Sequence, residues 1–201
     1  YYLAAAGYGG DKAIFGYGTT GSYSSLTNLV SSSGVVATDT TGVGTARGYV
    51  AGVSYGGDKA LFAYGYTGSN VSMSNLISNL GVVSADVTGV GTARGYLAAA
   101  SYDTDKAIFG YGYNGSANLS MSNLVSNNGI VASDVSGVGT ARRQLGAAGY
   151  GGDKAIFAYG KAGAFTSIKN LVNSSGVIAA DVTGVGTARE ATAAAGYSIS
   201  A

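Results

Sequence analysis

The chain has no cysteine, no histidine, no tryptophan and no proline among its 201 residues. Without cysteine there is no disulfide framework and no thiolate metal site. Without histidine or cysteine, the most common general base and the thiol nucleophile are both missing. The composition therefore favours a protein that is not an enzyme, and we expect no catalytic site, no metal site and no cofactor.

Charge is also scarce, since only 10% of the residues are charged and the formal net charge is +1. A nucleic-acid-binding surface needs a basic patch or stripe, which this composition does not supply. No apolar run approaches the roughly 18 residues that cross a bilayer as a helix. We therefore expect no nucleic-acid partner and no membrane span.

What the sequence does contain is one unit repeated four times. Each unit contains Asp-Lys-Ala-(Ile/Leu)-Phe-(Gly/Ala)-Tyr-Gly, and these motifs begin at Asp11, Asp58, Asp105 and Asp153. Each unit ends in Gly-Val-Gly-Thr-Ala-Arg, at Arg47, Arg94, Arg142 and Arg189. A period of 47 or 48 residues is typical of a propeller blade or a solenoid unit. We therefore divide residues 1–189 into units of about 1–47, 48–94, 95–142 and 143–189, which together form one domain.

Within a unit, four short apolar runs alternate with turn residues. In the third unit these runs are Tyr96–Tyr102, Ala107–Tyr111, Leu119–Ser126 and Ile130–Val135. No segment has the three-to-four-residue apolar period of a helix, and glycine recurs too often for one. The pattern predicts an all-β fold with four-stranded antiparallel units, which is the construction of a β-propeller with four blades. A β-solenoid is the alternative, although its coils are usually shorter.

The repeated unit resembles a kelch repeat. The third unit has an Arg at Arg94, a small apolar strand at Leu97–Ala100, a strand ending in glycine at Asp105–Gly112, a third strand at Asn123–Val125, and a closing Arg142. It departs from kelch units by having Gly-Tyr-Gly or Ala-Tyr-Gly for the paired glycine, and no tryptophan in the fourth strand. The units also resemble tandem repeats in environmental and phage-encoded proteins. The resemblance implies a kelch-like propeller, which is mostly a binding module. Its copper enzymes need cysteine and histidine, so that activity is excluded.

Residues 190–201 align with residues 1–12, so the first strand occurs five times and the others four times. One explanation is a tail, or a chain cut from a longer array. The other is strand exchange, in which this surplus strand completes a blade in a neighbouring molecule. The sequence therefore also allows part of a larger propeller or a strand-swapped one.

The invariant arginines have two interpretations. Each follows an aspartate by eight residues, at Asp39, Asp86, Asp134 and Asp181. A ring of arginines could bind an anion or an acidic glycan. Alternatively, an Asp–Arg bridge could lock the fourth strand to the next blade, and the repeated aspartate favours this interpretation because a buried arginine seldom goes unpaired. Calcium at these aspartates would need more oxygen ligands than one carboxylate per turn.

The units differ most in two segments, the loop between strands two and three and the two residues after each arginine. Antiparallel strand order puts both segments on the same face, where loops on a rigid scaffold commonly bind ligands. Tyrosine with serine, asparagine and glycine is also the composition of adaptable contact loops. Unconstrained drift is the alternative. The candidate binding residues are Tyr23, Tyr49, Tyr66, Asn70, Tyr96, Tyr113, Asn118, Arg143, Lys161 and Phe165.

These observations predict a non-enzymatic repeat scaffold. We expect a structural or adhesive module of an extracellular or virion assembly, self-associating through the surplus strand into a homo-oligomer or filament. The alternative is a lectin-like module that binds a glycan or a protein through the loops of one propeller face.

Overall fold

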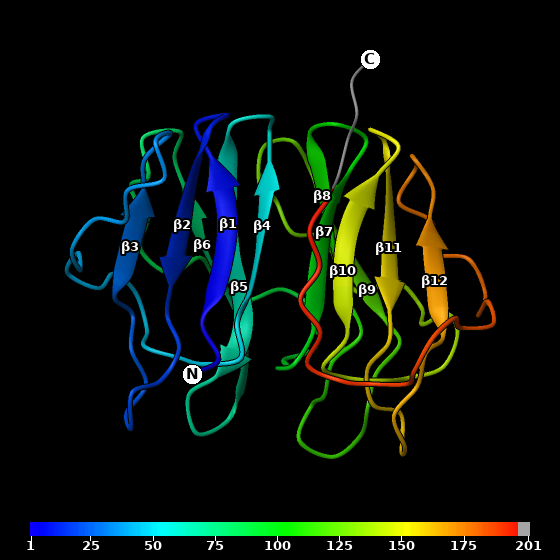
Figure 1. Cartoon of the computed structure of the whole chain (residues 1–201). Helices are drawn as coiled ribbons and strands as arrows, with labels where there is room; N and C mark the ends of the chain where they lie inside the picture. Colours follow the sequence, from blue (N-terminus) through cyan, green and yellow to red (C-terminus); the bar gives the residue numbers. More distant parts are fainter. Residues whose placement is uncertain (197–201) are drawn as a thin grey trace.

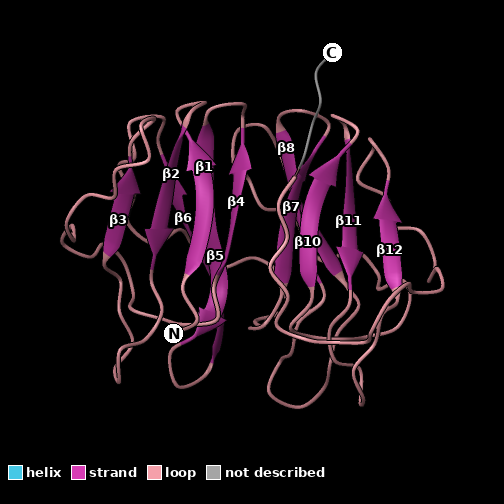
Figure 2. Ribbon diagram, viewed as in Figure 1, coloured by secondary structure: helices cyan, strands magenta, loops and turns pink. Residues whose placement is uncertain are grey.

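The computed structural model describes residues 1–196, and within them every regular element is a β-strand (Figures 1 and 2). The strands are β1 (Ala4–Tyr8), β2 (Lys12–Gly16), β3 (Thr27–Val30), β4 (Ala51–Tyr55), β5 (Lys59–Tyr66), β6 (Asn70–Ile77), β7 (Ala98–Tyr102), β8 (Lys106–Gly110), β9 (Ser122–Val125), β10 (Gly146–Tyr150), β11 (Lys154–Ala158) and β12 (Lys169–Val172). The all-β prediction is confirmed. The described part of the chain contains no helix that could span a membrane.

Each unit folds into one three-stranded antiparallel sheet in sequence order, from β1-β2-β3 to β10-β11-β12. The register is the same in every unit: Tyr8 pairs with Lys12 and Ala4 with Gly16 in the first, as Tyr102 pairs with Lys106 and Ala98 with Gly110 in the third. The three-residue turn between the first two strands carries the Asp-Lys motif. Its Asp11–Lys12 ion pair is exposed, which fits the turn chemistry expected of the motif.

The predicted fourth strand is not a regular strand. Each fourth segment instead meets the third strand at two isolated bridges, such as Val36 with Val30 and Thr40 with Thr27. The two bridges differ in register by one residue, so the pairing between them is irregular. The amide N–H of Ser84 still donates to the Leu76 carbonyl at 2.8 Å, and Asn75 Nδ2 donates to the carbonyl oxygen of Ser84 at 3.0 Å. Asn28, Asn123 and Asn170 make the same side-chain bond in their units.

The four sheets stand side by side with their first strands innermost, and β1, β4, β7 and β10 contact one another in that order. In Figure 1 the first and fourth sheets lie toward the viewer, and the second and third lie behind. Five segments at equivalent repeat positions line one cavity of about 290 Å³, and they contribute Leu3, Val50, Leu97, Leu145 and Thr192. The inner strands therefore surround a shared central space.

The core lies between successive sheets, in three clusters that each join two neighbouring units. A phenylalanine of one unit packs edge-on against a tyrosine of the unit before it. The ring centroids are 5.4 Å apart for Phe62 and Tyr17, and 5.3 Å apart for both Phe109–Tyr64 and Phe157–Tyr111. The inner strands approach closely: the Ser54 hydroxyl donates to the Gly7 carbonyl at 2.8 Å. The small residues of these strands, such as those of Ala4–Tyr8 and Ala98–Tyr102, allow this close approach.

The described part of the surplus copy packs on its own chain. The amide N–H of Ala191 donates to the Gln144 carbonyl at 2.8 Å, as the Tyr49 N–H donates to the Tyr2 carbonyl at 3.1 Å. Gly196 lies beside Gly149 of β10. In Figure 1 this red segment runs upward next to β10, on the side facing the first sheet. Residues 190–196 therefore occupy the place of a fifth inner strand, whereas residues 197–201 lie outside the described residues.

Candidate functional site

The two variable segments of the sequence meet at one end of the molecule. The residue after each arginine bridges the start of the following loop between strands two and three, in the pairs Gly48–Tyr66, Gly95–Tyr113 and Arg143–Lys161. This end is opposite the Asp-Lys turns, because β1 runs from one end to the other. The structure thus gathers the candidate binding residues around the mouth of the central cavity.

A column of three stacked tyrosines forms the centre of this end. The rings of Tyr2 and Tyr49 are 4.0 Å apart between centroids, and those of Tyr49 and Tyr96 are 4.1 Å apart. Tyr66 meets Tyr49 edge-on, and Tyr23 meets Tyr66 in the same way. Burial first, and then the neighbouring Tyr96 hydroxyl, raises the pKa of Tyr49, so this phenol stays protonated at neutral pH. The column presents aromatic faces and hydroxyl groups together.

The backbone at this column is held in an unfavourable conformation. Tyr2, Tyr49 and Tyr96 have φ angles of 58°, 57° and 57°, in the left-handed region that residues other than glycine seldom adopt. Gln144 shares this conformation at the next position around the cavity, with a φ of 54°. Such a conformation costs about 1–2 kcal/mol per residue, and it persists only where the surrounding structure enforces it. The same conformation recurs at Tyr17, Tyr64, Tyr111 and Tyr159, so it belongs to the backbone of every unit and does not by itself mark a binding site.

Beside the column, a second cavity of about 240 Å³ is lined by Tyr2, Tyr96, Tyr113, Arg143 and Gln144. The Arg143 guanidinium lies 4.7 Å from the centroid of the Tyr113 ring, and its Nη1 donates to Asn118 Oδ1 at 3.3 Å. The site therefore combines aromatic faces with a cation and amide groups that can donate hydrogen bonds.

The remaining candidates lie further out. Asn70 lies in the β5–β6 hairpin opposite Tyr66, and Lys161 faces the exposed ring of Phe165 at 5.5 Å. Sequence reasoning missed Tyr2 and Gln144, which line both cavities. Both follow from the repeat, because they occupy the same position as Tyr49 and Tyr96.

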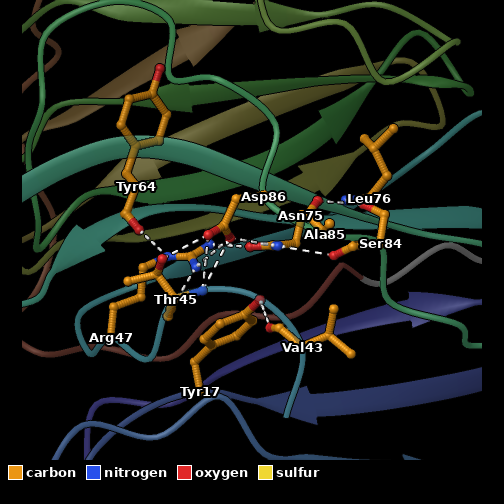
Figure 3. Close-up of polar contacts among 10 residues, drawn as sticks. All are labelled: Tyr17, Val43, Thr45, Arg47, Tyr64, Asn75, Leu76, Ser84, Ala85 and Asp86. Atoms are coloured by element: carbon orange, nitrogen blue, oxygen red, sulfur yellow. Dashed lines mark hydrogen bonds and ion pairs between the residues drawn. The ribbon is translucent and has the colours of Figure 1, made fainter.

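The invariant arginines connect neighbouring units. Figure 3 shows the first of these contacts, which we call a joint between units. The Arg47 side chain is fully buried. Its Nη2 donates to Asn75 Oδ1 at 2.6 Å and its Nε to the Tyr64 carbonyl at 2.9 Å, and both acceptors belong to the following unit. Its guanidinium also stacks 4.3 Å from the ring centroid of Tyr17 in its own unit. The arginine therefore fastens each unit to the next.

The aspartate of the following unit completes this joint. Asp86 accepts hydrogen bonds from the Thr45 hydroxyl at 2.7 Å and from Asn75 Nδ2 at 2.9 Å, and it lies 3.8 Å from Arg47 Nη1. We call Thr45–Arg47 and its equivalents the donor segment, and Asn75 with Asp86 and their equivalents the acceptor pair. The asparagine and threonine bonds of this joint recur at Arg94 with Asn123 and Asp134, and at Arg142 with Asn170 and Asp181. The Nε of Arg94 is the exception, because it has no hydrogen-bond partner.

This geometry favours the structural interpretation for three of the four arginines, whereas Arg189 is exposed. Arg47, Arg94 and Arg142 are 0% exposed, so they are not open to an anion. The Asp–Arg bridge between units is present, but its aspartate belongs to the following unit and not to the segment eight residues earlier. The bonded asparagine was not expected. It could have been found as the one invariant polar residue inside the apolar third strand. Donors from Thr45 and Asn75 already occupy the Asp86 carboxylate.

Acid is expected to weaken the joints. Burial alone would raise the pKa of Asp86, but hydrogen bonds from Thr45 and Asn75 and the charge of Arg47 leave it below its ordinary value. The pKa values of Asp134 and Asp181 are lowered in the same way. A lowered folded-state pKa means that the unfolded chain binds more protons, so these groups stabilise the fold above about pH 4, and this stabilisation is lost as the pH falls through the folded pKa.

Urea unfolding between pH 7 and pH 2 measures this loss. The midpoint should fall on acidification, and Asp86→Asn should show a smaller fall than the unaltered chain. An equal fall in both proteins would contradict this assignment.

No protein-family model matches the sequence, and a search of curated proteins found no match to it.

Proposed function

We propose that this chain is a non-enzymatic, kelch-like β-propeller module that binds a glycan at its tyrosine-rich end. The observation that carries the proposal is the pair of adjoining cavities lined by Tyr2, Tyr96 and Gln144. The larger is near the lower limit, about 300 Å³, of typical small-molecule pockets.

The chemistry of the site suits a sugar. Exposed aromatic faces pack against the apolar C–H face of a pyranose ring, while phenol, amide and guanidinium groups bond its hydroxyls. The Tyr113–Arg143 pair and Tyr96 line one cavity, where they offer both kinds of contact. An extracellular or virion-surface location fits such a role and is part of this proposal.

Titration with the sugars selected by a glycan array tests the proposal. Tyr96→Ala and Tyr113→Ala should each weaken binding at least about ten-fold, which corresponds to about 1.4 kcal/mol. Tyr150→Ala is the matched control, since Tyr150 is 36% exposed and lies at the opposite end of β10. No glycan bound at all, or equal affinity for Tyr96→Ala and Tyr150→Ala, would refute it.

A self-associating scaffold is the second candidate. Its support is the surplus inner strand, whose described part packs beside β10 and could instead pair with a neighbouring molecule. Light scattering over a range of concentrations tests this candidate, and a monomer at every concentration would remove it.

A further inference from the structure

The first and fourth units each carry half of a joint whose arginine and asparagine are buried at the three internal joints. Arg189 is exposed, whereas Arg47, Arg94 and Arg142 are fully buried. In the first unit Asn28 is only partly buried, whereas Asn75 is fully buried, and no arginine donates to Asn28 in the described structure. The molecule therefore carries one spare donor segment and one spare acceptor pair.

Both spare halves are already arranged for bonding. Arg189 stacks 4.0 Å from the Tyr159 ring centroid, and its Nη1 donates to the Thr187 carbonyl at 3.1 Å, as Arg47 does with Tyr17 and Thr45. Asn28 Nδ2 donates to Asp39 Oδ1 at 2.8 Å, which is the arrangement of the internal acceptor pairs. A preformed site loses less entropy on binding, and opposite charges favour association.

The apolar packing is unfinished on the same two faces. Phe15 is 39% exposed, whereas Phe62, Phe109 and Phe157 are 0% exposed because each packs on the unit before it. A cavity of about 200 Å³ joins Phe15 to Asn28 and Asp39. A cavity of about 340 Å³ joins Tyr159 to Arg189 on the fourth unit. Each open face lacks the partner that the three internal faces have.

The exposed faces of the first and fourth units lie on either side of one gap in the arrangement of units around the central cavity, which we call the open sector. Five segments line the central cavity, and residues 190–196 fill the fifth inner position without strands two to four beside them. Suppose that a second copy of the chain docked its first unit against Arg189 in the way that neighbouring units dock on each other. The second unit of that copy would then overlap the first unit of the original chain. The open sector therefore has room for the outer part of a single unit.

We propose that the open sector binds one further unit of this same repeat. That unit would supply an acceptor pair to Arg189 and a donor segment to Asn28 and Asp39, and it would cover Phe15. The proposal concerns the sides of the molecule, so it is independent of the glycan site at the tyrosine-rich end.

A synthetic peptide with the sequence of residues 151–189, added to the intact chain, tests the proposal. Native mass spectrometry should show a one-to-one complex, and the melting temperature should rise. Arg189→Ala and Asp39→Ala in the chain should each weaken peptide binding at least ten-fold. Lys59→Ala and Asp58→Ala are matched controls, because they remove the same charges from an exposed ion pair in the second unit.

Three outcomes would overturn the proposal: no complex, a complex insensitive to Arg189→Ala and Asp39→Ala, or a dimer of the chain alone that these two changes disrupt. A second measurement avoids a free peptide, which could aggregate. The sequence of residues 151–189 is fused to the chain after residue 197, and in this extended chain Asn28→Ala should lower the melting temperature as much as Asn75→Ala does. If Asn28→Ala remains mild in the extended chain, the proposal is wrong. Adding two units instead of one should give no further rise, because the sector is already filled.

Discussion

Replacing Asn75 with alanine is expected to destabilise the protein by about 3 kcal/mol or more. The substitution removes the 2.6 Å hydrogen bond to the buried Arg47 guanidinium and the amide that joins Asp86 to Ser84. A hydrogen bond to a buried charged group contributes about 1.5–3 kcal/mol, more than an ordinary hydrogen bond, and the lost bonds to Asp86 and Ser84 add to this. Urea unfolding of the variant measures the change in unfolding free energy.

The repeat supplies a matched control for this substitution. Asn28→Ala removes the same side chain from the same position of the first unit, where no arginine of the described structure donates to it. The expected cost is below about 1 kcal/mol, since only partly exposed hydrogen bonds are lost. Equal losses for Asn28→Ala and Asn75→Ala would mean that the joint between units contributes nothing particular to stability.

The second large effect is expected from Phe62→Ala, at about 3–5 kcal/mol. The Phe62 ring is fully buried between two sheets, in edge contact with Tyr17 and against the backbone at Gly16 and Gly52. Its removal leaves a cavity that closely packed sheets cannot fill by relaxing.

Phe15→Ala is the corresponding control, because Phe15 stands at the same repeat position but is 39% exposed. Its loss should cost less than half as much, since the ring packs on one side only. Thermal melting of the two variants compares them directly. A Phe15→Ala change as costly as Phe62→Ala would show that the packing between sheets is not the source of stability.

Much of this fold can be predicted from the sequence. The period of 47 or 48 residues defines the units, and the apolar runs with their turns predict the first three strands of each. The fourth segment is not a regular strand because its pairing with the third strand shifts register by one residue between two bridges, which hydrophobic alternation does not reveal. The sequence also could not show which aspartate lies beside each arginine, because the aspartates of four near-identical units have the same sequence surroundings. Only the packing of one sheet on the next places Asp86, and not Asp39, beside Arg47.

The position of the tyrosine-rich end, though not its role, can be predicted in part from the sequence. Antiparallel strand order places the two variable segments together, and the structure brings Tyr49, Tyr66 and Tyr96 to one cavity mouth. Gln144 lies in a variable segment but was not chosen, and Tyr2 was overlooked because no arginine precedes it in this sequence. Their role depends on the convergence of successive units on a common centre, which is a property of the assembled sheets.

The central claim is that the units occupy four of five positions around one cavity. The absence of native cysteine allows a clean distance measurement with pairs of spin labels. Cysteines would replace Ser33, Leu80, Asn128 and Ser175, which are equivalent exposed residues in the turns after the third strands. Labels on the first and fourth units should then be as far apart as labels on the first and third, and farther apart than labels on the first and second. A first-to-fourth distance equal to the first-to-second distance would indicate a closed ring of four units, and a first-to-fourth distance longer than both others would indicate an extended stack; either result would contradict the account.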